Sequence, residues 1–225
     1  MQRTKRKAAP RKLVCLETYW GDHQTRVFHT PSVLPLFEGL GRLLDPPLAI
    51  AHRHVGTLSQ LATYTRRGEG MLWRDPEAFD APVYYLSFHG SPGRIHTALT
   101  RLGPGVLCKA FAGWGEVYDN LVYFGACSVF AGKRGERFAA RFLKESRCRA
   151  VLGYASDVDW MESMVVDLLF LKRFYAERDP WQNLASIHAS VLEDLAPARR
   201  LGLRLFTSPA SARATRARPA AARRG

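Results

Sequence analysis

Two short apolar segments, separated by a helical stretch, constrain the fold of this chain more than any other feature. The first, residues 82–88 (PVYYLSF), is rich in β-branched and aromatic residues and stops at His89-Gly90. The second, residues 121–124 (LVYF), stops at Gly-Ala-Cys-Ser, residues 125–128. Each has the composition of a buried strand followed by helical sequence, a pattern typical of neighbouring parallel strands.

Parallel strands place their carboxyl ends at the same edge of a sheet, and in open α/β sheets this edge faces the binding crevice. We therefore expect the imidazole of His89 and the thiol of Cys127 to lie side by side on one rim, although 38 residues separate them in sequence. A thiol beside an imidazole is the arrangement that nucleophilic catalysis by cysteine requires.

The rest of the chain repeats the alternation of strand and helix. Apolar runs and periodicity predict strands at 13–19, 47–52, 82–88, 121–126 and 149–154, and helices at 31–44, 57–66, 103–114, 132–146, 160–175 and 181–195. Residues 68–81 are expected to be irregular. This order predicts an α/β fold, a three-layer sandwich with a mostly parallel central sheet and helices on both faces.

The net charge of +13 is confined to the two ends of the sequence. Residues 1–12 carry six lysines or arginines and residues 197–225 carry eight arginines, with no acid in either segment. Residues 13–196 have 19 bases and 20 acids, a net charge of −1. We expect a basic disordered N-terminus at 1–12, one domain at 13–196 and a disordered Ala/Arg/Pro-rich tail at 197–225. Nucleic acid would then bind only through these tails.

Composition excludes several other classes. No apolar run is long enough for a membrane span, and the N-terminus does not resemble a secretory signal. The four cysteines are Cys15, Cys108, Cys127 and Cys148; they form no CxxC pair and no zinc-binding spacing, which favours free thiols in the cytoplasm. No glycine-rich phosphate loop follows a strand, so nucleotide binding has little support.

Cys127 is the candidate nucleophile and His89 the candidate base. A thiol at the end of a buried strand, entering a helix, would be exposed and close to a helix dipole, while Gly125 and Ala126 would leave room for a carbonyl. Gly90 would let a backbone N–H point into the site, and with the amide of Cys127 it would form an oxyanion hole. The alternatives are a core cysteine and a strand-end histidine bound to a loop carbonyl.

Acidic residues near the same rim could select a basic substrate. Asp157 and Asp159 follow the fifth predicted strand, and Glu17 and Asp22 follow the first. A carboxylate there would favour Lys or Arg through a charge-assisted pair, although capping of the next helix is the more common use of Asp157 or Asp159. His52-x-His54 could be half of a metal site, but the sequence shows no third ligand at a sensible spacing.

The segments VYYLSFHGSPGRI, LVYFGACSVF and FAARFLKESRCRAVLGYASDVDW resemble the caspase-like superfamily of cysteine peptidases (clan CD), in particular its bacterial CHAT-like members. The resemblance covers roughly residues 82–175. It implies a caspase-like fold and peptide hydrolysis through a thioester, with His89 as base, Cys127 as nucleophile and Gly90 as an oxyanion donor. It also implies that the cleavage needs no metal and no organic cofactor. It also implies a protein or peptide substrate, and often a partner protein that controls activation.

Two other functions remain open on the residues alone. One is a catalytically inactive caspase-like interaction module whose basic tails bind nucleic acid or acidic partners. The other is a flavodoxin-like ligand binder, which would need a phosphate-accepting loop after the first strand. The sequence LETYWGDHQTR at that point lacks the Ser, Thr and Gly cluster of such loops, so this function ranks last.

Overall fold

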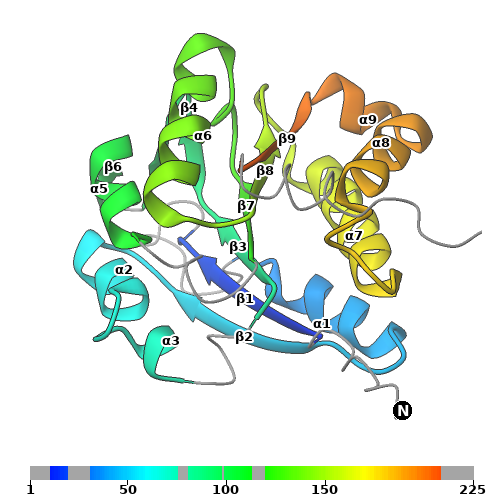
Figure 1. The fold of residues 1–225 in the computed structure, drawn as a ribbon, viewed down its shortest axis with the longest axis horizontal. Coiled ribbons are helices and arrows are strands. Elements are labelled where there is room, and N and C mark those ends of the chain that lie inside the picture. Colours follow the sequence, from blue (N-terminus) through cyan, green and yellow to red (C-terminus); the bar gives the residue numbers. More distant parts are fainter. Residues whose placement is uncertain (1–10, 20–30, 76–80, 98, 113–119, 209–225) are drawn as a thin grey trace, which may run out of the picture.

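The computed structural model describes residues 11–19, 31–75, 81–97, 99–112 and 120–208, and they form one central sheet with helices on both faces (Figure 1). The sheet has six strands in the order β2-β1-β3-β7-β8-β9. The first five run parallel, and β9 runs antiparallel to β8 at one edge. Their bounds are β1 (Lys12–Glu17), β2 (Ala49–His54), β3 (Val83–Ser87), β7 (Leu121–Gly125), β8 (Ala150–Tyr154) and β9 (Leu203–Thr207).

A smaller antiparallel sheet extends from the end of β3. It consists of β4 (His89–Ser91), β5 (Arg94–His96) and β6 (Arg101–Leu102), in that order. Gly93 has a positive φ of 73° in the turn between β4 and β5, a conformation that costs glycine nothing. His89 is the first residue of this small sheet, directly after the end of β3.

The helices divide into two layers, one on each face of the central sheet (Figure 1). One layer contains α2 (Leu58–Thr65), α3 (Met71–Arg74), α5 (Pro104–Ala110) and α6 (Gly132–Ser146). The other contains α1 (Leu34–Leu43), α7 (Trp160–Ala176), α8 (Leu184–Asp194) and α9 (Ala196–Arg200). None of the helices in the described ranges is long and apolar enough to cross a membrane.

Successive residues of the central strands point alternately into two hydrophobic cores, one on each face of the sheet. Tyr84 and Val122 pack under the α5–α6 layer, whereas Tyr85 and Tyr123 pack under the α1–α7 layer. Because both faces are covered, these strands are apolar at nearly every position instead of alternating with polar residues. The predicted fold class and the five parallel strands are therefore confirmed.

The expected boundary of the domain at residue 196 was wrong. Helix α9 and strand β9 lie within the segment that was expected to be a disordered tail, and β9 pairs with β8 along its full length. Two arginines of this segment make ion pairs inside the domain, Arg200 with Glu162 and Arg204 with Glu136. A short edge strand interrupted by arginine resembles a solvated tail in composition, which is why the pattern was missed. The N-terminal residues 1–10 and the segment 209–225 lie outside the described residues.

A buried carboxylate joins α7 to three central strands. Asp167 has no exposed surface and accepts hydrogen bonds from the hydroxyls of Tyr85 (2.5 Å), Tyr154 (2.5 Å) and Tyr123. Burial raises the pKa of Asp167 from 3.8 to about 6, although the three hydroxyl donors favour the charged form. Burial, followed by the charge of Asp167, also raises the pKa of each of these tyrosines well above 10.

This carboxylate should make stability depend on pH between about 4 and 6. A raised pKa means that the folded state binds the proton more tightly than the unfolded state, so its contribution is full below pH 4 and is lost as pH rises through 6. We expect urea unfolding of the wild type, relative to Asp167→Asn, to lose about 3 kcal/mol between pH 4 and pH 7. Parallel pH profiles for the two proteins would contradict this assignment.

Candidate active site

Strands β3 and β7 deliver the two candidate catalytic residues to the same edge of the sheet. They pair in parallel with Ser87 opposite Gly125, and each chain runs two residues further to reach His89 and Cys127. The N–H of Phe88 donates to the carbonyl of Gly125 at 3.4 Å, which keeps the two chains together beyond the ladder. The topology thus places both residues at the carboxyl ends of adjacent parallel strands.

The backbone of Gly90 lies directly against Cys127. A Cβ atom on Gly90 would be 2.1 Å from the carbonyl oxygen of Cys127 and 2.9 Å from Cγ2 of Val129. No side chain fits in that space, so glycine is required here for close approach of two backbones. The His-Gly and Ala-Cys steps are therefore in direct contact.

His89 lies on the β4–β5 hairpin with a second histidine opposite it. It pairs with His96 in the ladder, and the Nε2 atom of His96 lies 2.8 Å from Oγ of Ser91. His89 is exposed, and the partial burial that remains lowers its pKa below 6.5. Burial, followed by the charge of Arg101, lowers the pKa of His96 as well. Both rings thus favour the neutral form, the form that can accept a proton at neutral pH.

Cys127 differs from the other three cysteines in its access to solvent. It is half-buried, whereas Cys15, Cys108 and Cys148 are buried. Burial raises the pKa of Cys108 and Cys148 to about 12, and that of Cys15 well above 9. These three thiols belong to the core.

The backbone of Val158 holds the sulfur of Cys127. The N–H of Val158 lies 3.5 Å from Sγ, and the thiol lies 3.8 Å from the carbonyl oxygen of Val158. Val158 belongs to the loop between β8 and α7, so this loop joins the same rim, as predicted. Nothing in the sequence marks a backbone amide for this contact, and the role of Val158 was not foreseen.

The residue after Cys127 has a strained backbone. Ser128 has φ of +53°, in the left-handed region, which costs a residue other than glycine on the order of 1 kcal/mol. Two contacts with the β8–α7 loop hold it in place: its N–H donates to the carbonyl of Ser156 at 2.9 Å, and its hydroxyl donates to Asp157 at 2.5 Å. The turn that contains Cys127 is thus fixed by the loop that follows the neighbouring strand β8.

Two expectations about Cys127 were wrong. Helix α6 begins at Gly132, so Cys127 lies in a turn and not at the N-terminus of a helix. The space beside Gly125 is not open, because a Cβ there would lie 2.1 Å from the hydroxyl oxygen of Tyr85. The sulfur is therefore positioned by the Val158 backbone, and Gly125 makes room for a core tyrosine.

The four candidate substrate-binding acids have different surroundings. Asp159 caps α7, accepting from the N–H of Glu162 at 3.0 Å, which is the structural role left open for it. Asp157 is exposed and lies on the rim beside the Cys127 turn, bound to Ser128. Glu17 has no exposed surface. Asp22 lies outside the described residues.

Glu17 belongs to a polar cluster with two histidines at the ends of β1 and β2. Its carboxylate accepts from the N–H of Val33 at 2.9 Å and the hydroxyl of Ser32 at 2.6 Å, and it lies 2.7 Å from Nε2 of His52. His54 completes a group whose ligating atoms all lie within 4.8 Å of one another, so the third possible metal ligand comes from the neighbouring strand. As they stand, these contacts fasten the start of α1 to the sheet.

Access and thiol pKa together predict selective alkylation. At pH 8 we expect iodoacetamide to modify Cys127 first, because the other thiols are buried and two of them have a pKa of about 12. Peptide mapping by mass spectrometry measures the order, and the same reaction in denaturant should label all four cysteines. Modification of Cys108 at the same rate as Cys127 in the folded protein would contradict the expected difference in access.

A scan of protein families finds no match for the chain, and a search of curated proteins finds none. Among solved structures, the fold is similar to that of caspase-1 from Spodoptera frugiperda, with a TM-score of 0.51. The superposition covers 92% of each chain at 11% sequence identity. A likeness at this identity establishes architecture and not activity. The chain therefore has the mixed α/β architecture of the caspases, with a mostly parallel six-stranded sheet.

Proposed function

We propose that the protein is a cysteine endopeptidase that cleaves peptide bonds with Cys127 as nucleophile and His89 as base. The observation that carries the proposal is the direct contact between the Gly90 backbone and Cys127, at the carboxyl ends of two adjacent parallel strands. A half-buried thiol at that contact, in a chain whose other described thiols are buried, supports the same assignment.

The proposed reaction begins when the imidazole of His89 takes the proton of the Cys127 thiol. The sulfur attacks the carbonyl carbon of the peptide bond, and the N–H groups of Gly90 and Cys127 would stabilise the negative oxygen. Collapse of this intermediate breaks the C–N bond, the imidazolium gives its proton to the departing amine, and a thioester remains. Water activated by His89 then releases the acid and restores the thiol.

Among the candidate acids that the structure describes, Asp157 is the carboxylate best placed to select a substrate. It is exposed on the rim and lies one residue from Val158, whose backbone contacts the Cys127 sulfur. A negative charge beside the nucleophile favours a Lys or Arg side chain on the acyl side of the cleaved bond. CHAT-like or bacterial ancestry, a cytoplasmic location and control by a partner protein belong to the same proposal.

The decisive experiment labels the protein with acyloxymethyl ketones that carry Lys, Arg or Asp next to the warhead. We expect the Lys and Arg reagents to label the wild type faster than the Asp reagent, and Cys127→Ala to abolish labelling. His89→Ala should slow labelling by about 100-fold or more, because the thiol loses its base. His96→Ala is the matched control, since this ring lies opposite His89 in the hairpin.

Three outcomes would count against this assignment. Labelling that persists in Cys127→Ala would remove that residue as nucleophile. Equal slowing in His96→Ala and His89→Ala would show that the hairpin, and not the His89 ring, is needed. A folded protein that no reagent labels would instead fit a caspase-like interaction module without activity.

The close contact at Gly90 gives a further test. Gly90→Ala should reduce labelling by at least about tenfold, because its Cβ would force the hairpin away from the Cys127 carbonyl. Gly103→Ala serves as control, since a Cβ at Gly103 meets no atom within 4 Å. Thermal unfolding of both variants checks that the domain remains folded. Unchanged labelling in Gly90→Ala would show that the contact does not matter for reactivity.

A further inference from the structure

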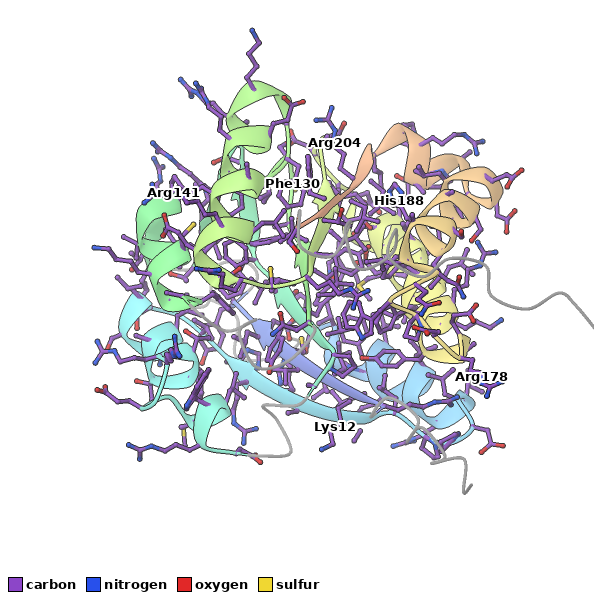
Figure 2. The ribbon with its side chains drawn as sticks, viewed as in Figure 1. Lys12, Phe130, Arg141, Arg178, His188 and Arg204 are labelled. Atoms are coloured by element: carbon purple, nitrogen blue, oxygen red, sulfur yellow. The ribbon has the colours of Figure 1, made fainter. Side chains whose placement is uncertain are left out.

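Basic side chains gather on the outer side of the α5–α6 layer. One surface hollow of about 350 Å³ lies between the β4–β5 turn and helices α5 and α6, and the bases that line it are Arg94, Arg134, Arg137 and Arg141. A second hollow, of about 510 Å³, is lined by Arg66, Arg67, Lys109, Lys144 and Arg147, with Glu145 as its acid. We call these nine bases the α6 basic face; Figure 2 shows Arg141 among them, pointing outward.

The acids near this face are already paired, two of them with bases of the face itself. Glu145 pairs with Arg141 at 2.6 Å, and Glu69 pairs with Arg66 at 3.0 Å. Glu136, on the same helix, pairs with Arg204 at 3.2 Å. Six bases of the face form no ion pair with any residue in the described ranges: Arg94, Lys109, Arg134, Arg137, Lys144 and Arg147. The face therefore has a surplus of positive charge in a domain that is close to neutral overall.

The shape of the face fits an extended polyanion. Helix α6 connects the two hollows, and the distance from Arg134 to Arg147 along a helix axis is about 20 Å, equal to about six base pairs of duplex. Guanidinium groups predominate, and their planar fork matches a phosphate in two hydrogen bonds. The spacing and chemistry are those of contacts to a phosphodiester backbone.

The face does not have the composition of a protein interface. Such interfaces have an apolar or aromatic centre from which charged residues are depleted. Here Phe138 lines the first hollow but is 2% exposed, and the exposed large hydrophobic residues of the described chain include no aromatic one. The half-buried ring of Trp73 is covered by Arg67 at 5.6 Å, so the described residues of the face offer no fully exposed ring on which bases of a single strand could stack. These observations favour the backbone of a duplex.

We propose that the α6 basic face binds the phosphate backbone of double-stranded nucleic acid without reading its sequence. This site lies on the folded domain, whereas the sequence had assigned nucleic-acid binding to the basic ends alone. The inference does not depend on peptidase activity, since none of the nine bases has a role in the proposed reaction. Binding through phosphates should weaken steeply with salt, because each contact releases a counterion.

The test compares two triple variants of the full chain that lose the same charge. The face variant is Arg94→Gln, Arg134→Gln and Arg137→Gln. The control variant is Arg42→Gln, Lys172→Gln and Arg178→Gln, at exposed bases of the α1–α7 side of the molecule, where Figure 2 labels Arg178. Both variants keep the basic segments 1–12 and 209–225, so any difference in affinity between them measures the contribution of the α6 basic face.

Fluorescence anisotropy with a labelled 20-base-pair DNA duplex, a duplex RNA and oligo(dT) measures affinity from 50 to 200 mM salt. For the duplexes we expect the face variant to bind at least about tenfold more weakly than the wild type. The plot of log affinity against log salt concentration should become less steep, its slope falling in magnitude by about 3. The control variant should stay within about twofold. Arg94→Lys, Arg134→Lys and Arg137→Lys should retain most of the affinity, since the charge remains.

Three results would overturn the proposal. Equal loss in the two triple variants would assign binding to net charge or to the ends of the chain. Tighter binding of oligo(dT) than of either duplex would exclude a duplex site. Polyglutamate that binds the wild type better than the duplexes, and is lost in the face variant, would identify an acidic protein as the partner.

Discussion

The parallel pairing of β3 with β7 sets the geometry of both the core and the rim. With Ser87 opposite Gly125, Tyr85 and Tyr123 point to the same face and both reach Asp167 on α7. The same register carries His89-Gly90 to Cys127 two residues beyond the ladder. Because side chains alternate with a period of two, a shift of one residue would turn one tyrosine of this pair away from Asp167 and separate Gly90 from the Cys127 carbonyl. One ladder therefore fixes two features that are far apart in sequence.

The core and the candidate active site also meet at a single side chain. The hydroxyl of Tyr85 donates to Asp167 and occupies the space that a Cβ at Gly125 would need, two residues before Cys127. The buried Asp167 thus helps to fix the position of β7, the strand that leads into the turn with Cys127. The β8–α7 loop fixes this turn through backbone contacts of Val158 and Ser156. The rim is therefore held by Asp167 and its tyrosine partners on the core side and by backbone contacts with the β8–α7 loop.

Sequence patterns predicted what depends on local composition. The α6 range 132–146 and the β7 segment follow from periodicity and apolar runs, and the common edge of His89 and Cys127 follows from parallel topology. The patterns failed where a contact is made by backbone atoms or by a distant partner. Val158 contacts sulfur through its amide, and β9 becomes a strand only because β8 offers an edge. The polar group around Glu17 needed His52 and His54 to be brought beside β1, which no spacing within one segment could indicate.

The distribution of charge over the surface also depends on the fold and could not be predicted from the sequence. Residues 13–196 are almost neutral in sum, yet folding gathers nine of their 19 bases on the α6 basic face. The β4–β5 hairpin connects this face to the rim: Gly90 contacts Cys127 on one side, while Gly93 lies so close to α6 that its Cβ would be 3.2 Å from the carbonyl of Arg134. The hairpin that begins with His89 is therefore packed between the candidate active site and helix α6, so the same short segment borders both proposed sites.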